Sequence, residues 1–107
     1  MKKSTPSGCA DIMKALGDAT RLAVLQALLE RPQHVNDLME RVKVEQSLLS
    51  HHLKVLREAG LVTATRDGKA VLYQVAPEIK GATKDQCIDL DCCQVVFRPS
   101  IKGRKAL

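Results

Sequence analysis

The most constraining feature of this sequence is a long amphipathic segment, Glu45 to Ala59, which is followed at once by two short β-type runs. Leu49, Leu53 and Leu56 recur at helical spacing, which predicts a helix with one buried stripe. Gly60 follows at the position where a left-handed residue ends a helix. The opposite face of this helix is polar and carries Ser47, Ser50, His51, Lys54, Arg57 and Glu58.

The two runs after this helix predict a β-hairpin. They cover residues 61–66 and 69–75 and are rich in Val, Thr and Leu. Asp67-Gly68 separates them and predicts a two-residue loop with the positive φ angles of a type I′ turn. Arg66 and Lys69 flank this loop, so the tip of the hairpin is expected to be basic.

Apolar residues at helical spacing predict three shorter helices before the long one. The first, from Cys9 to Leu16, ends at Gly17, and Asp18 then caps the second by accepting backbone N–H bonds from Thr20 or Arg21. Three helices, a longer fourth and a hairpin form the order of a winged helix-turn-helix domain, a mainly α fold with a small β-hairpin (α+β). Ile12, Met13 and Leu16 give the helical spacing of the first helix. The residues expected to face the core are Leu22, Leu25 and Leu29 in the second helix, and Val35, Leu38 and Val42 around a third over residues 35–41.

Charge and composition indicate the partner of this domain. The net charge of +5 favours an anionic partner, and the 2% aromatic content disfavours a reader of single strands that stacks bases. Double-stranded DNA is therefore expected, with the fourth helix in the major groove. The candidate DNA-binding residues are Gln46, Ser47, Ser50 and His51 for base edges, Lys54 and Arg57 for phosphates, and Arg66 and Lys69 for an adjacent minor groove or backbone.

The 107 residues suit one compact domain with short extensions. Residues 1–8 are expected to be a flexible basic arm, residues 9–76 the winged helix-turn-helix DNA-binding domain, and residues 77–107 an extended, Cys-containing arm with a basic tail. The chain shows no apolar run long enough to span a membrane and no signal peptide, which predicts a soluble, cytoplasmic protein.

Two stretches, ALGDATRLAVLQALL and SLLSHHLKVLREAGLVTATRDGKAVLYQV, resemble the ArsR/SmtB family of bacterial metal-responsive repressors, from about Ala15 to Val75. The resemblance implies a homodimer that binds an inverted-repeat operator and is released by a metal ion or metalloid, with the first and last helices at the dimer interface. Glu45 stands where many members have Ser, and His51 stands where Arg is common. These departures bear on the operator sequence rather than on DNA binding itself.

The ligand sets of several family members are absent. PQHVNDL places His34 and Asn36 where those members have two cysteines, and the tail lacks the Asp, His and Glu set that others use for zinc. Any sensing is therefore assigned to thiolates, which are soft ligands for Zn(II), Cd(II), Pb(II), Cu(I) and trivalent arsenic. The candidate metal ligands are Cys87, Cys92 and Cys93, with Cys9 as a further ligand from the same subunit or its partner.

Local geometry limits how these thiols could meet. Adjacent side chains of a regular strand point to opposite faces, so Cys92 and Cys93 can share an ion only if the arm is irregular. A redox or persulfide switch, and a constitutive repressor whose cysteines only pack, remain open as alternatives. An enzyme is not expected, because the chain has no Gly-rich phosphate loop, no HExxH motif and no nucleophile elbow.

Overall fold

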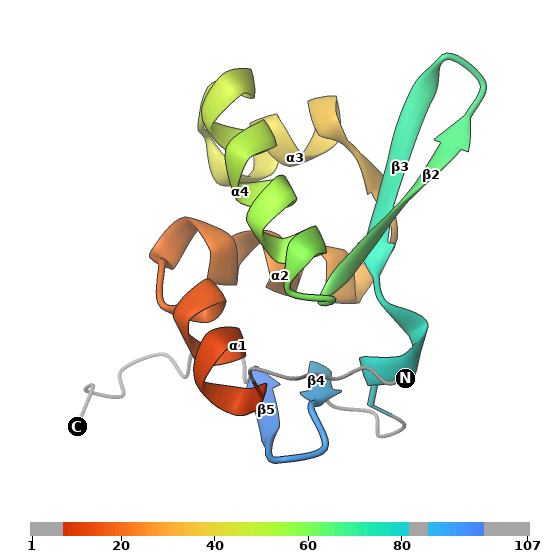
Figure 1. The fold of residues 1–107 in the computed structure, drawn as a ribbon. Coiled ribbons are helices and arrows are strands. Elements are labelled where there is room, and N and C mark those ends of the chain that lie inside the picture. Colours follow the sequence, from red (N-terminus) through yellow and green to blue (C-terminus); the bar gives the residue numbers. More distant parts are fainter. Residues whose placement is uncertain (1–7, 82–85, 98–107) are drawn as a thin grey trace, which may run out of the picture.

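The computed structural model describes residues 8–81 and 86–97, and the expected basic tail and most of the N-terminal arm lie outside them. Four α-helices come first in the chain (Figure 1), and a β-hairpin, the wing, follows them. The helices are α1 (Gly8–Leu16), α2 (Ala19–Glu30), α3 (Val35–Val42) and α4 (Gln46–Glu58), and the wing consists of β2 (Val62–Asp67) and β3 (Ala70–Val75). This order confirms the predicted winged helix-turn-helix fold.

The core lies between the helices and the base of the wing. Leu49, Leu53 and Leu56 of α4 are all buried, which confirms the stripe predicted for that helix. Leu25 and Leu38 of α2 and α3 are fully buried beside them. On α1, Leu16 is buried, whereas the side chain of Met13 is 39% exposed.

Asp18 caps α2 as the sequence predicted. Its Oδ1 accepts hydrogen bonds from the backbone N–H groups of Thr20 (2.8 Å) and Arg21 (3.1 Å). The Arg21 N–H bond is the main reason that the pKa of Asp18 lies below its usual value, because it favours the charged carboxylate; the Thr20 N–H bond adds to this effect. Desolvation by burial acts in the opposite direction and is outweighed.

The lowered pKa of Asp18 gives a pH-dependent contribution to stability. A depressed carboxyl pKa stabilises the fold above the unfolded pKa of about 4, and this contribution is lost as the pH falls through the lower folded pKa. We expect Asp18→Asn to keep the helix cap, and therefore the wild-type melting temperature at pH 7. Below pH 4 the melting temperature of the wild type should fall more steeply than that of the variant, as followed by circular dichroism. Parallel curves would show that Asp18 contributes nothing to acid unfolding.

The loop of the wing differs by one residue from the prediction. Asp67 pairs with Ala70, so the two loop residues are Gly68 and Lys69 rather than Asp67 and Gly68. Of these two, only Gly68 has a positive φ, of 66°. The predicted type I′ turn over Asp67 and Gly68 would have placed Asp67 in the left-handed region as well. A type II′ turn over Gly68 and Lys69 needs glycine only at its first central position. The chain takes the turn that strains no side-chain-bearing residue.

Two short segments complete the described fold. Strand β1 (Gln33–His34), which the sequence analysis missed, pairs with β3 and gives a sheet in the order β1-β3-β2. After the short helix η1 (Pro77–Ile79), strands β4 (Gln86–Asp89) and β5 (Gln94–Phe97) form a second antiparallel hairpin. The segment that carries the tail cysteines thus contains two paired strands. No helix within the described ranges is both long and apolar enough to cross a membrane.

The second hairpin is part of the folded domain. Cys87, Ile88 and Leu90 are buried, and Ile88 and Leu90 join the apolar core formed by the helices. Partly buried Val95 and Phe97 of β5 pack against the same core. The β4–β5 hairpin lies beside α1, at the end of the molecule away from the wing tip (Figure 1).

Candidate DNA-binding surface and thiol cluster

The residues predicted to contact DNA form an exposed surface on α4 and the wing. The N-terminal end of α4 and the tip of the wing both lie on the side of the molecule opposite α1 and the β4–β5 hairpin (Figure 1). α4 begins after Glu45, which precedes the helix without a side-chain cap bond. All eight predicted residues are exposed: Gln46, Ser47, Ser50, His51, Lys54, Arg57, Arg66 and Lys69.

The wing is held to the start of α3 by a contact that the sequence did not reveal. His34 Nε2 lies 2.8 Å from Asp67 Oδ2, next to the basic tip. On the other side of the ring, His34 Nδ1 lies 3.9 Å from Asp37 Oδ2. The contact links the residue just before α3 to the last residue of β2.

His52, the neighbour of the exposed His51, is buried in the domain. The residue is 6% exposed. Its Nδ1 lies 3.0 Å from Arg21 Nη1, and its Nε2 lies 3.9 Å from Asp18 Oδ1. Arg21 was not singled out in the sequence, because one exposed-looking Arg in a first helical turn carries no distinctive signal.

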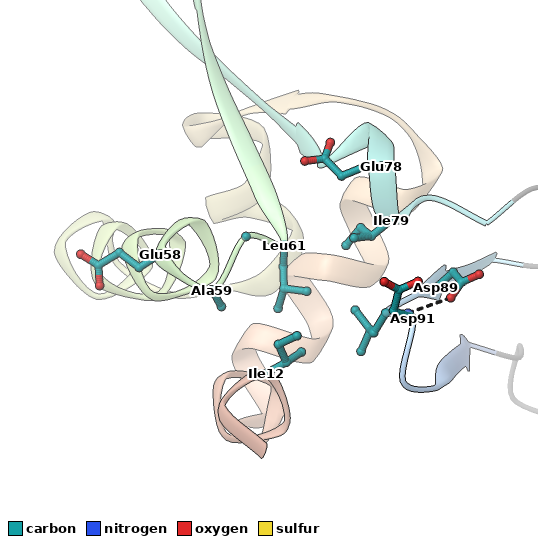
Figure 2. Close-up of a pocket in the computed structure, with 10 residues that line it drawn as sticks. Ile12, Glu58, Ala59, Leu61, Glu78, Ile79, Asp89 and Asp91 are labelled. Atoms are coloured by element: carbon teal, nitrogen blue, oxygen red, sulfur yellow. Dashed lines mark hydrogen bonds between the residues drawn. The ribbon is translucent and has the colours of Figure 1, made fainter. Parts of the chain in front are cut away.

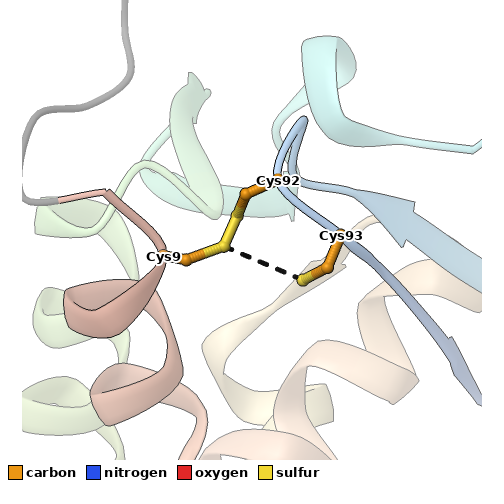
Figure 3. Close-up of side chains that lie close together, drawn as sticks. All are labelled: Cys9, Cys92 and Cys93. Carbon is orange, nitrogen blue, oxygen red and sulfur yellow. Dashed lines mark hydrogen bonds between the residues drawn. A yellow bond between two sulfur atoms is a disulfide. The ribbon is translucent and has the colours of Figure 1, made fainter.

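Three of the four cysteines meet where α1 approaches the β4–β5 turn (Figure 3). Cys9 and Cys92 form a disulfide with their Cα atoms 6.3 Å apart. The Sγ of Cys93 lies 3.9 Å from the Sγ of Cys9, and all three sulfur atoms lie within 4.8 Å of one another. We call these three residues the thiol cluster.

The β4–β5 turn provides the irregularity that adjacent cysteines need. Asp91 has a φ of 75°, in the left-handed region, and its N–H donates to Asp89 Oδ1 at 3.0 Å. The Cys92 N–H and the Leu90 carbonyl, and the Leu90 N–H and the Cys93 carbonyl, are each 2.8 Å apart. This tight turn breaks the strand alternation, so that Cys92 and Cys93 both face Cys9 (Figure 3).

Cys87, the remaining predicted ligand, lies outside the thiol cluster. It is 5% exposed on β4, pairs in register with Val96, and packs against Gly81. A side chain at Gly81 would collide with the Cys87 sulfur. The structure therefore brings Cys9 together with Cys92 and Cys93, and it places Cys87 in the core.

The spacing of the cluster fits an ion held by three sulfurs. With metal–sulfur bonds of about 2.3 Å, a trigonal arrangement places the sulfur atoms about 4.0 Å apart. The observed 3.9 Å between Cys9 and Cys93 matches this value. In the reduced protein, the Cys92 sulfur only has to move away from the Cys9 sulfur for the three sulfur atoms to reach this trigonal spacing. Within the described residues, no histidine or carboxylate lies close enough to join this group of ligands.

A cavity of about 760 Å³ lies between α1, the end of α4, η1 and the β4–β5 turn (Figure 2). Its floor is apolar and includes Ile12, one turn along α1 from Cys9. Its walls also contain four carboxylates. They belong to Glu58, Glu78, Asp89 and Asp91.

A helix with an exposed polar face, a basic wing and a separate thiol cluster define a winged helix-turn-helix regulator. The family profile described as "Bacterial regulatory protein, arsR family" matches residues 18–64. The chain belongs to this family, whose members are transcriptional regulators rather than enzymes.

Similar proteins agree with this assignment. The HTH-type transcriptional repressor SmtB of Mycobacterium tuberculosis is 39% identical over 66 residues, which cover 62% of this chain and 49% of that protein. A probable mercury resistance operon repressor of Streptomyces lividans is 33% identical over 96 residues, covering 82% and 77% of the two chains. A homodimeric winged helix-turn-helix domain from Mycobacterium bovis superposes with a TM-score of 0.62 at 30% identity, covering 64% of each chain. The chain thus spans about half the length of SmtB.

Proposed function

We propose that this protein is a transcriptional repressor that binds operator DNA as a homodimer and is released when its thiol cluster binds a soft metal ion or arsenite. The observation that carries the proposal is the convergence of Cys9, Cys92 and Cys93 from opposite ends of the chain. Three thiolates without nitrogen or oxygen ligands favour soft, three-coordinate ions such as Cd(II), Pb(II) or trivalent arsenic. Structural zinc prefers four ligands, so Zn(II) fits this set less well.

The site would act by joining α1 to the β4–β5 turn. Ligand binding holds Cys9 at the start of α1 to two cysteines of the turn, within one subunit. An ion that binds better to one arrangement of these elements shifts the protein towards that arrangement. A coupling of about 1–3 kcal/mol would lower operator affinity by roughly 5–150-fold.

A thiol redox switch is the second candidate, favoured by the Cys9–Cys92 disulfide. In this reaction the two thiols lose two electrons and two protons and form the S–S bond. Hydrogen peroxide would accept these electrons and protons and be reduced to two molecules of water. The disulfide uses two of the three sulfurs that would hold an ion, so oxidation and ion binding exclude each other.

The test is a titration of the reduced protein on a duplex selected from a random library by the ligand-free protein. Arsenite, Cd(II), Pb(II) and Zn(II) are added separately, and hydrogen peroxide is added in a further arm. We expect arsenite or Cd(II) to release the wild type and to leave Cys93→Ser bound, as measured by fluorescence anisotropy. Cys87→Ala is the matched control, because that cysteine lies outside the cluster.

The outcomes separate the candidates. If arsenite or Cd(II) releases Cys87→Ala from the duplex but leaves Cys93→Ser bound, the result supports the ion-responsive repressor. Release by peroxide alone, lost in Cys9→Ser and kept in Cys93→Ser, supports the redox switch instead. If no addition changes the binding of the wild type, the protein is a constitutive DNA-binding regulator, and the proposal is wrong.

A further inference from the structure

The thiol cluster and the DNA-reading face lie at opposite ends of the domain, and one side chain connects the helices that carry them. Arg21, in the first turn of α2, donates from Nε to the carbonyl of Ala15 at 2.5 Å. Its Nη1 lies 3.0 Å from Nδ1 of His52. The same guanidinium therefore contacts the last turn of α1 and the middle of α4.

The contact with Arg21 specifies which ring nitrogen of His52 carries the proton. A guanidinium only donates hydrogen bonds, so His52 Nδ1 must be the acceptor. The ring then carries its proton on Nε2, which faces Asp18 Oδ1 at 3.9 Å. With His52 only 6% exposed, water has little access to replace these partners. The contact is directional, and a shift of either helix would lengthen or break it.

α1 is a short helix with one functional contact at each end. Cys9 lies in its first turn, and Ala15 and Leu16 are buried at its end. Ala15 lies six positions after Cys9, which corresponds to about 9 Å along the helix axis. A helix this short moves as a unit, so a shift of Cys9 that accompanies the separation of its sulfur from that of Cys92 also displaces the Ala15 carbonyl.

We infer that Arg21 is a positioning residue that couples the thiol cluster to the recognition helix, an inference that rests on the proposed function. A displacement of the Ala15 carbonyl changes the position of Arg21, and Arg21 in turn moves His52 on α4. His51 is adjacent and exposed on the DNA-facing side, so a rotation of α4 about its axis changes the presentation of the base-reading residues. The ion thus acts on DNA binding without approaching the DNA.

The experiment measures the ratio of operator dissociation constants with and without saturating arsenite or Cd(II). Arg21→Lys keeps the charge, but one ammonium cannot bond both acceptors as the planar fork does. His52→Leu removes the acceptor, whereas His52→Asn keeps an acceptor oxygen near the position of Nδ1. Thermal melts establish that each variant is folded, and thiolate absorption measures the ion affinity of the free protein.

We expect Arg21→Lys and His52→Leu to bind the ion and the ligand-free operator as the wild type does, while the ratio falls from roughly 5–150 towards one. His52→Asn should retain the ratio of the wild type. The double variant, Arg21→Lys with His52→Leu, should lower the ratio no further than either single variant, because both substitutions act through one contact. In the wild type, nitrogen NMR of the His52 ring should change when arsenite is added, and this change should be absent in Arg21→Lys.

Two results would overturn the inference. If the folded variants keep the full ratio while the wild type is released, coupling does not pass through Arg21, although the ion-responsive repressor stands. If the wild type itself binds no ion, or binds it without release, the proposed function fails and the coupling role fails with it.

Discussion

Replacing Lys54 and Lys69 together by glutamine is expected to weaken binding to duplex DNA about 30-fold at 0.15 M salt for each subunit that contacts the DNA. Lys54 is exposed on α4, and Lys69 is the second loop residue of the wing. Each lysine that neutralises a phosphate releases counterions, so the loss reflects missing ion release rather than a missing base contact. The expected loss is similar for all DNA sequences.

The salt dependence distinguishes this effect from a general loss of positive charge. The slope of log affinity against log salt should fall by about one for each lysine removed. Lys14→Gln/Lys80→Gln is the matched control, because these lysines are exposed on α1 and after η1 and the variant has the same net charge. Equal weakening in both variants would mean that α4 and the wing are not the DNA-binding surface.

Cys9→Ser is expected to lower the arsenite affinity of the reduced protein by more than the roughly 10–100-fold typical of changes beside a metal ligand. It removes the only cysteine that α1 contributes to the thiol cluster. Saturation at 100 times the dissociation constant should stabilise the wild type by about 2.7 kcal/mol, because the ion binds only the folded arrangement. The corresponding rise in melting temperature is about 10 °C or more.

Differential scanning fluorimetry with and without arsenite measures this stabilisation. Cys9→Ser should show little of it at the same arsenite concentration, whereas Cys87→Ala should show the wild-type rise. A full rise in Cys9→Ser would place the arsenite on the β4–β5 turn alone and exclude the link to α1.

Features set by local pattern were predictable from the sequence. The spacing of Leu49, Leu53 and Leu56 predicted the buried face of α4, and Asp18 capped α2 at the predicted N–H groups. The loop of the wing was displaced by one residue, because the choice between adjacent two-residue loops depends on strand register. The two-residue strand β1 was missed because so short a segment has no measurable periodicity.

Features that depend on distant contacts were only partly predictable. The sequence indicated thiol chemistry at the tail, but the membership of the cluster follows from a contact across 83 residues between Cys9 and Cys92. Cys87 lies close to these cysteines in the sequence, yet its register on β4 directs it into the core. The bridge made by Arg21 was invisible for the same reason, since its two acceptors lie on different helices.

The number of sulfur atoms around a bound ion tests the central claim most directly. X-ray absorption at the arsenic edge of the reduced, arsenite-loaded full-length protein measures that number. Because the cluster consists of Cys9, Cys92 and Cys93, we expect one arsenic per chain with three sulfur neighbours and no nitrogen or oxygen. The same measurement on Cys9→Ser should show fewer than three sulfur neighbours around the arsenic. Two sulfur neighbours in the wild type, or three in Cys9→Ser, would contradict the account.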